Sequence, residues 1–308
     1  MTDTTLPSPR NNLNPFAGLM SGTVGPVVVV ILAILAIWYI AAVALNAPFQ
    51  NSIYERAKRT DVTFAELVSD TFSQEKPVLP APHQVFGEIS KKTIGTKLTS
   101  KRSLFFHAGI TLSPTLLGFF IGTTLGILLA IGIVHSRVLE KSLMPWVISS
   151  QTIPILAIAP MIILVLNAIN ITGLLPKALI STYLSFFPIT VGMVKGLRSP
   201  EVIHMDLMRT YSATRVQAFW KLRLPYAVPY LFTSAKIGIA ASLVGAIVGE
   251  LPLGATGGLG SLLLVNSYYS QTVQMWSALL MAAFLAGSLV ALIGILEKVA
   301  LKRMGMSR

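Results

Sequence analysis

The chain of 308 residues contains no cysteine, and charged residues make up only 12% of it. The absence of cysteine excludes disulfides and thiolate metal sites. A soluble domain carries about 25% charged residues, so this chain, with 53% hydrophobic residues, is poorly suited to water. Its charges stand in blocks, and the uncharged gaps between the blocks are long enough to cross a bilayer.

Motifs for nucleotide hydrolysis and for other enzyme chemistry are also absent. No Gly-Lys dipeptide occurs, so there is no phosphate-binding loop of the G-x-x-x-x-G-K-[ST] kind. No G-x-S-x-G sequence occurs, and the scattered histidines form no H-x-x-x-H pair. An enzyme is therefore disfavoured, and we expect no metal or cofactor in this chain. The net charge of +12 accompanies no basic run with interleaved aromatics, which argues against nucleic acid as a partner.

Six apolar stretches, four of them without any charge, predict an all-α integral membrane protein with about six transmembrane helices. The first stretch runs from Gly25 to Leu45. A secretory signal peptide is the competing interpretation, but its apolar core would be about 7–15 residues long and nearer the N-terminus. We therefore expect an uncleaved helix. The other spans are expected at about Ala108–Val134, Met144–Ala168, Leu174–Val194, Ile237–Leu251 and Met275–Ile295.

Lysine and arginine in the short loops predict the orientation, because cytoplasmic loops carry an excess of both. If the N-terminus is inside, the inner segments hold fourteen of these residues and the short outer loops hold no charge. The inner segments are then 1–24, 135–143, 195–236 and 296–308, and the short outer loops are 169–173 and 252–274. The basic segment 46–109 would lie outside, which the rule permits for loops beyond about 60 residues. Both termini are predicted to be cytoplasmic.

This topology divides the chain into five parts. They are a cytoplasmic tail (1–24), the first transmembrane helix (25–45), an extracytoplasmic segment (46–106), a core of five transmembrane helices (107–300) and a second cytoplasmic tail (301–308).

The extracytoplasmic segment is expected to contain one amphipathic helix over residues 61–73. Thr63 and Glu66 fit a capping box. Apolar residues recur on one face at helical spacing, at Phe64, Leu67, Val68 and Phe72. Two interpretations are open, a docking element for an outside partner and a helix that lies on the membrane or packs on the spans, and the second is favoured.

The loop from 195 to 236 is too long for a plain turn and shows two short helical patterns. One pattern runs from Val202 to Tyr211 and the other from Val216 to Leu222, after which Pro225 and Pro229 are expected to interrupt the chain. An apolar, aromatic face on a polar loop implies burial, either on the protein's own bundle or in a soluble partner.

The second half of this loop resembles the signature of importer permeases, which reads EAA, three residues, G, nine residues, I, one residue, LP. This chain has Asp206-Leu207-Met208, Ser212, Leu222 and Leu224-Pro225 at matching positions. It departs by Asp for Glu, Leu-Met for Ala-Ala, Ser for Gly and Leu for Ile. The Gly is expected at a bend, where a positive φ or a close approach is needed; Ser212 can turn there, but less freely.

In that family the loop forms a coupling helix that sits in a cleft of the ATP-binding subunit. Because the loop around Asp206–Arg215 carries apolar residues on a surface expected to be cytoplasmic, we expect Met208, Tyr211 and Ala213 to form the inserted face, with Arg209 and Arg215 at a polar rim. The full set of implied coupling residues is Glu201, Asp206, Met208, Arg209, Tyr211, Ser212, Ala213 and Arg215.

Further segments resemble the subfamily that imports nitrate, sulfonates, taurine and pyrimidine precursors, and together the resemblance covers about residues 79–300. The matching segments are Leu79–Val85, Thr111-Leu112 with Gly118, Gly122 and Gly126, Ile153-Pro154 with Pro160, and Gly249-Glu250-Leu251 followed by Gly257-Gly258-Leu259-Gly260. The stripe of three glycines in the second span is interpreted as helix packing.

The resemblance implies the permease of a type I ABC importer with a MetI-like core in a bacterial inner membrane. Its implied partners are a second permease copy, two ATP-binding subunits that hold ATP and magnesium, and an extracytoplasmic solute-binding protein. Transport would proceed by alternating access. The solute is not readable from the chain. Two alternatives are a secondary transporter, which would need intramembrane charges, and a membrane protein that docks an ATPase without transport.

Glu250 is the one acidic residue at the end of a predicted span. A charge there is costly and is usually functional or paired. It is therefore a candidate for lining the pathway, gating it, or pairing across a dimer interface. The alternative is that Glu250 lies hydrated at the outer surface or bonds to local backbone.

Overall fold

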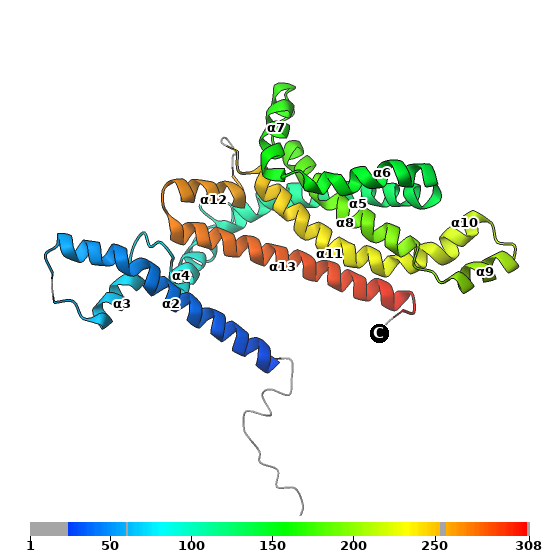
Figure 1. The fold of residues 1–308 in the computed structure, drawn as a ribbon. Helices are drawn as coiled ribbons and strands as arrows, with labels where there is room; N and C mark the ends of the chain where they lie inside the picture. The colour runs from blue at the N-terminus through cyan, green and yellow to red at the C-terminus, as the bar shows by residue number, and fades with distance from the viewer. Residues whose placement is uncertain (1–23, 60, 253–256, 307–308) are drawn as a thin grey trace, which may run out of the picture. The chain divides into compact units, whose positions relative to one another are not determined.

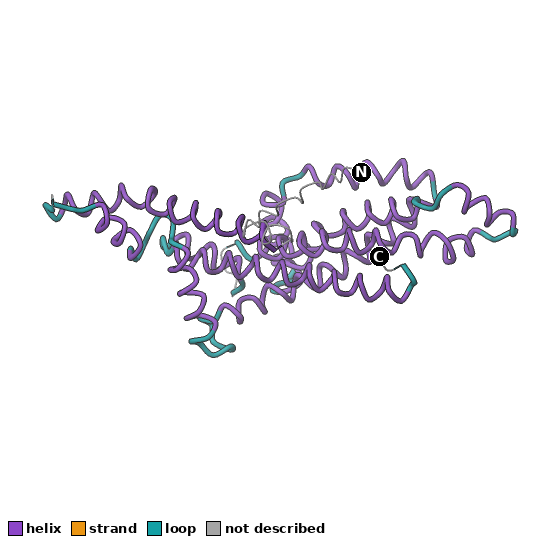
Figure 2. Tube along the Cα trace, turned by 90° about the horizontal axis from the view of Figure 1, so that it is seen from below, coloured by secondary structure: helices purple, strands orange, loops and turns teal. Residues whose placement is uncertain are grey.

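The computed structural model describes residues 24–59, 61–252 and 257–306, so the predicted N-terminal tail lies almost wholly outside the described residues. The described part is built from helices, without a strand (Figure 2). It divides into two compact units, residues 1–85 and 86–308 (Figure 1), and each is described by itself. The expected all-α class is confirmed.

The first unit contains α2 (Val24–Arg56) and α3 (Phe64–Ser73). The helix α2 continues beyond Leu45, where the first transmembrane span was expected to end. The extra turns are fastened by Asn46, which is fully buried. Its side-chain oxygen accepts a hydrogen bond from the Val78 N–H at 2.7 Å, and its amide group donates to the Leu79 carbonyl at 2.8 Å. These bonds hold the segment after α3 against α2.

The predicted amphipathic helix exists as α3, but its predicted capping box is wrong. Thr63 is the N-cap residue, yet its side chain makes no capping hydrogen bond. Glu66 instead pairs with Arg59 at 2.6 Å. Arg59 precedes α3 and carries a full charge, so it attracts this carboxylate more strongly than a backbone N–H would. The aromatic residues Tyr39, Phe72 and His83 cluster, with ring centroids 5.6 to 5.9 Å apart.

The second unit begins within α4 (Pro82–Thr93) and is dominated by four long helices that run side by side (Figure 1). They are α5 (Leu104–His135), α8 (Leu174–Leu197), α11 (Leu224–Gly249) and α13 (Thr272–Arg303). Together with α2, the described chain has five helices long and apolar enough to cross a membrane, or six if one bent pair counts as a span. The expected number of about six is therefore confirmed.

The interpretation of the glycine stripe as packing is confirmed by the contact between α5 and α8. A Cβ atom added at Gly118 would lie 2.3 Å from the Ser181 Cβ, and one at Gly122 would lie 2.1 Å from the Ser185 Oγ. On the other side of α8, a Cβ at Gly245 of α11 would lie 2.7 Å from the Ser181 Cα. The three helices approach this closely only because these positions lack side chains.

The prediction of one continuous third span over Met144–Ala168 is wrong. This region forms α6 (Arg137–Ser149), a 3₁₀ turn η1 (Ser150–Thr152) and α7 (Ile155–Ala168), and the two parts meet at an angle of 100°. Pro154 supplies no N–H, and a residue before proline is driven to extended backbone. Ile153 accordingly has φ −83° and ψ 121°. The hydroxyl of Tyr183 donates to the freed Ser150 carbonyl.

The predicted interruption at Pro225 and Pro229 is also wrong. A π-helical turn, η2 (Phe219–Arg223), runs directly into α11, and both prolines lie inside that helix. Pro225 has no N–H to donate to the preceding turn, and that turn takes the π-helical form of η2, in which the Leu224 N–H donates to the Phe219 carbonyl. Spanning helices tolerate an internal proline such as Pro229. The fifth span is therefore longer than expected. A further helix, α12 (Leu259–Tyr268), lies in what was expected to be a plain outer loop.

Candidate functional site

The connection between α8 and α11 is a pair of short helices at one end of the second unit (Figure 1). Helix α9 (Val202–Thr210) follows the N-cap residue Glu201, and α10 (Arg215–Ala218) leads into η2. We call residues 199–223 the α9–α10 loop. The same end holds the junction of α5 and α6, where Glu140 pairs with Arg198 at 3.0 Å.

The bend between the two short helices is centred on Ser212, at the position where the signature expects glycine. Its φ is +52°, in the left-handed region. The Ser212 N–H donates to the Arg209 carbonyl at 2.8 Å, and the Ala213 N–H donates to the Met208 carbonyl at 2.9 Å. This is the Schellman arrangement that satisfies the last carbonyls of a helix. The expectation of a positive φ at this residue is confirmed.

The second short helix is held by a capping box that the sequence analysis did not identify. The Thr214 Oγ accepts from the Gln217 N–H at 3.3 Å, and the Gln217 side chain accepts from the Thr214 N–H at 2.9 Å. Phe219 follows as a buried anchor, with its ring 5.3 Å from that of His135 at the end of α5. The loop is therefore ordered by its own caps and fixed to the bundle at Phe219.

Much of the outward surface of this loop is apolar. Val202 is 75% exposed, Leu207 is 53% exposed and Tyr211 is 75% exposed. Ile203, Val216 and Trp220 are exposed as well. We call Val202, Ile203, Leu207, Tyr211, Val216 and Trp220 the outer apolar face. An exposed apolar face on a loop outside the membrane-spanning helices indicates a binding surface.

The residues implied for coupling are brought together on this loop but divide into two sets. Glu201, Asp206 and Tyr211 are exposed, and Asp206 pairs with Arg209 at 3.1 Å. Met208 and Ala213 are instead half-buried and line a cavity of about 410 Å³ beneath the loop, together with Arg209 and Arg215. Tyr211 belongs to the outer apolar face, whereas Met208 and Ala213 are less exposed than it is.

Glu250 lies at the other end of α11 and is fully buried. Its Oε2 accepts from the Thr111 hydroxyl at 3.0 Å and from the Gly260 N–H at 2.9 Å. Its Oε1 has no hydrogen-bond partner, and no cation forms an ion pair with it in the described part of the chain. Of the alternative interpretation, the hydrated carboxylate is wrong, because the residue is fully buried, whereas the bond to local backbone is confirmed by the Gly260 N–H.

Glu250 contacts a glycine loop, Gly257–Gly260, which forms the start of α12. A Cβ atom at Gly258 would lie 2.2 Å from the Glu250 Cδ, so the carboxyl group packs directly on this glycine. Gly258 also has a φ of +116°, which L side chains rarely adopt. Only glycine meets both requirements at this position.

Two residues of α5, Thr111 and His107, complete this arrangement. Only Thr111 lies in a segment that carries the family resemblance. The Thr111 Oγ accepts from the Leu259 N–H at 2.9 Å, and His107 Nδ1 accepts from the Gly258 N–H at 3.0 Å. Because a main-chain N–H only donates, the proton of this ring must be on Nε2, which donates to the Lys101 carbonyl at 2.9 Å.

We call Glu250, Thr111, His107 and the glycine loop the latch. His107 was set aside as a scattered histidine. Its spacing of four residues from Thr111, which puts both on one helix face, was the available signal.

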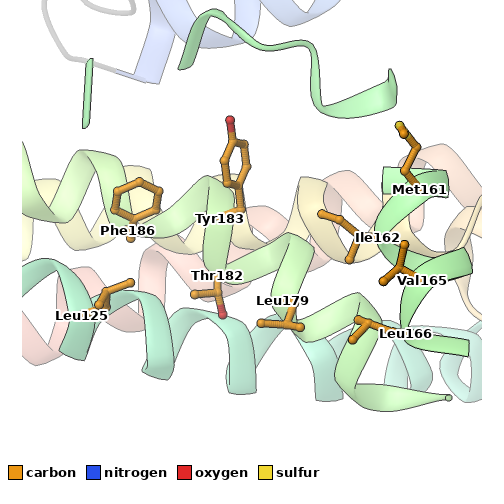
Figure 3. A pocket seen from close by; sticks show the side chains of 9 residues that line it. All are labelled: Leu125, Met161, Ile162, Val165, Leu166, Leu179, Thr182, Tyr183 and Phe186. Atoms are coloured by element: carbon orange, nitrogen blue, oxygen red, sulfur yellow. The ribbon is translucent and has the colours of Figure 1, made fainter. Parts of the chain in front are cut away.

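A second cavity, of about 550 Å³, opens at the surface between α5, α7 and α8 (Figure 3), and Met161 and Val165 of its lining are exposed. Tyr183 and Phe186 supply aromatic rings, and Thr182 supplies a hydroxyl that already donates to the Ala178 carbonyl. The other lining residues are Leu125, Met161, Ile162, Val165, Leu166 and Leu179.

The comparisons with known proteins agree with this architecture. Residues 122–306 match the family described as "Binding-protein-dependent transport system inner membrane component". A probable ABC transporter permease from Haemophilus influenzae is 31% identical over 65% of this chain and 79% of its own length. The formylaminopyrimidine transport permease ThiX of Halalkalibacterium halodurans is 33% identical over 59% of this chain and 68% of its own. The riboflavin transport system permease RibX of Chloroflexus aurantiacus is 32% identical over 72% and 78%.

The chain therefore belongs to the family of binding-protein-dependent permeases, and it is an integral membrane permease of an ABC importer. Relatives at 25 to 26% identity are named as aliphatic sulfonate, taurine and nitrate permeases, so the resemblance to that subfamily is confirmed. Membership implies that the chain works with ATP-binding and solute-binding components. The interpretation as a secondary transporter is wrong, because the chain belongs to a different family.

Proposed function

We propose that this permease forms the translocation pathway of an ATP-driven importer and is driven through the α9–α10 loop. ATP and magnesium are bound by two ATP-binding subunits, one against each copy of a permease homodimer, and an extracytoplasmic binding protein delivers the solute. The observation that carries the proposal is the outer apolar face. It stands on an ordered loop at one end of the bundle, and nothing in the described chain covers it.

The loop is connected to the bundle in a way that suits the transmission of movement. Helix α8 enters it after only a short turn, and α10 and η2 leave it without a break into α11. The helical segment from Arg215 to Gly249 counts as one span of 35 residues. A displacement of the loop therefore moves α11 as a rigid element, and α11 ends beside the latch. Alternating access follows if the latch opens and closes with this movement.

The orientation that this mechanism requires has the loop and both termini in the cytoplasm. Its support is the excess of lysine and arginine in the segments at this end, against none in the short loops at the other. Single cysteines at Arg215 and Gln271, tested with an impermeant thiol reagent on intact cells, check it. Labelling is expected at 271 only, and labelling at 215 from outside would contradict the orientation.

For the solute, we favour a heteroaromatic compound of the pyrimidine type over nitrate, taurine or a sulfonate. The relatives with named solutes above 30% identity carry formylaminopyrimidine and riboflavin. The cavity of Figure 3 supports the choice, because Tyr183 and Phe186 can stack on a flat ring and no basic residue lines it to hold an anion. A screen of pyrimidines, nitrate and sulfonates by thermal shift of the partner binding protein tests it.

The coupling role is tested by placing a charge on the outer apolar face. Leu207→Glu is expected to abolish both the co-purification of the ATP-binding subunit and solute-stimulated ATP hydrolysis, because a carboxylate cannot be buried in an apolar contact without a partner. Val138→Glu is the matched control, since Val138 on α6 is equally apolar and 74% exposed. Normal co-purification and hydrolysis in the Leu207→Glu variant would refute the assignment of this face.

A further inference from the structure

The cavity beneath the α9–α10 loop is lined by an unusual number of cationic groups. It has a volume of about 410 Å³ and lies between the end of α5 and the loop. Arg209, Arg215 and Arg223 all line it, as does His135, and no acidic residue is among the lining residues. The remaining walls are apolar or small, formed by Val134, Met205, Met208, Ala213 and Ala218.

The charges of this cavity are poorly compensated within the described chain. Arg209 pairs with Asp206, but that pair is exposed and therefore contributes little. Neither Arg215 nor Arg223 forms an ion pair with any described residue. Arg209 and Arg215 are exposed and Arg223 is half-buried, so three side chains of the same charge line one cavity, and an anion there would be attracted by all three. The planar fork of arginine matches the oxygens of a phosphate in particular.

His135 adds a directed group to the same cavity. Its Nδ1 bonds to the Ile131 carbonyl at 2.8 Å, so the proton lies on Nδ1, and the ring is held against Phe219 at 5.3 Å. Nε2 is left without a partner among the described residues. The ring is thereby fixed in orientation while one nitrogen is available to a ligand, accepting from a phosphate hydroxyl or donating when the imidazole is protonated.

We infer that this cavity binds a phosphate group, carried either by an anionic lipid headgroup or by free phosphate. His135 is the last residue of α5 and Arg223 the last before α11, so the cavity lies where two membrane helices meet the loop. Basic pockets at this level on the cytoplasmic side of a membrane suit lipid headgroups. A bound phosphate joins α5 to the α9–α10 loop and so sets the position of the loop; that regulatory consequence rests on the proposed coupling function, whereas the binding does not.

The experiment measures binding to the full-length chain alone, purified in a neutral detergent, without ATP-binding subunits. One arm titrates phosphatidylglycerol against phosphatidylcholine, and the other titrates inorganic phosphate. Arg215→Gln and Arg223→Gln are each expected to weaken binding roughly 10- to 100-fold, since a hydrogen bond to a charged group contributes about 1.5–3 kcal/mol. Arg137→Gln is the matched control, because Arg137 is exposed on α6 and does not line the cavity.

Each outcome bears on the inference. Selective loss of phosphatidylglycerol binding in the two variants assigns the site to a lipid headgroup, and selective loss of phosphate binding assigns it to free phosphate. Equal binding by the wild-type chain and both variants, or no binding of either probe, would overturn the inference. Either variant suffices if the other fails to fold. Coupling by the Leu207→Glu variant is measured in a separate assay. Binding of either probe to the wild-type cavity therefore supports this inference whether that variant is coupled or uncoupled.

Discussion

At the scale of single residues, the turn of the α9–α10 loop depends on a serine in a conformation that glycine prefers. Ser212 has a φ of +52° and closes α9 through the bonds of its own and the following N–H group. A left-handed residue with a Cβ costs roughly 1–2 kcal/mol. The loop tolerates this because both bonds satisfy carbonyls that would otherwise have no partner at the helix end.

Ser212→Gly is therefore expected to stabilise the chain by about 0.5–1 kcal/mol, the relief of the left-handed conformation less the greater entropy that glycine loses on folding. Ser212→Val is expected to destabilise it, because a β-branched residue is least compatible with positive φ. Thermal unfolding of the purified chain in detergent measures both. A lower unfolding temperature for Ser212→Gly would show that the serine hydroxyl, rather than the backbone, decides the stability of the turn.

The second residue-scale prediction concerns the charge of Glu250. Hydrogen bonds to a carboxylate are about twice as strong as those to a neutral amide, so Glu250→Gln is expected to loosen the glycine loop while preserving its shape. The side-chain NH2 group of the new glutamine can occupy the place of Oε1, which has no hydrogen-bond partner among the described residues. Uptake into reconstituted vesicles should fall severalfold, with normal amounts of assembled permease in the membrane.

Glu88→Gln is the control for this prediction, because Glu88 forms a partly exposed ion pair with Lys92 at 3.2 Å. Its loss should leave uptake near the wild-type level. Wild-type uptake by the Glu250→Gln variant would leave Glu250 with a purely structural role in holding the glycine loop.

At the scale of elements, the contact between α5 and α8 decides how far the bundle can adjust. Gly122→Ala places a methyl group 2.1 Å from the Ser185 Oγ, and the overpacking is expected to cost about 1–3 kcal/mol. Adding Ser185→Ala removes the overlapping atom and should restore part of the loss. Gly109→Ala on the same helix, where nothing lies within 4 Å, should be neutral. Unfolding temperatures of these three variants and of Ser185→Ala alone measure the coupling between positions 122 and 185. An absence of coupling would contradict the packing described.

The existence and number of the membrane helices followed from hydropathy, since a bilayer allows few other structures for such segments. Their ends did not, because apolar composition does not mark where a helix stops. The third span breaks at Ile153–Pro154, whereas α11 passes through Pro225 and Pro229 unbroken. Whether a proline breaks a helix depends on what satisfies the carbonyls nearby, and the Tyr183 hydroxyl that does so at the break comes from another helix.

The two candidate sites also differ in how far the sequence predicts them. The α9–α10 loop was found from a local pattern, because its signature lies within one stretch of chain. Of the predicted inserted face, Tyr211 is exposed while Met208 and Ala213 line the cavity, and which of them contacts a partner stays a prediction. The latch joins residues 107, 111, 250 and 258–260, which only the packing of α5 on α11 brings together. No local pattern contains that information.

At the scale of the whole second unit, one helical segment connects the two candidate sites. The chain passes from Arg215 through η2 and α11 to Gly249, and Glu250 follows directly. The outer apolar face thus lies at one end of a continuous helix and the latch at the other (Figure 1). A partner that moves the loop needs no other element to reach the glycine loop. The proposed coupling depends on this continuous helix.

The most direct test of this account is a site-specific cross-link between the α9–α10 loop and the ATP-binding subunit. Because the chain has no cysteine, single cysteines at Leu207 and Tyr211 can be joined to the co-expressed subunit with a short thiol-to-amine reagent in membranes. Tyr268, which is 72% exposed on α12 at the other end of the unit, is the control position. The account predicts cross-links at 207 and 211 and none at 268. Cross-linking at 268 with none at 207 or 211 would contradict it.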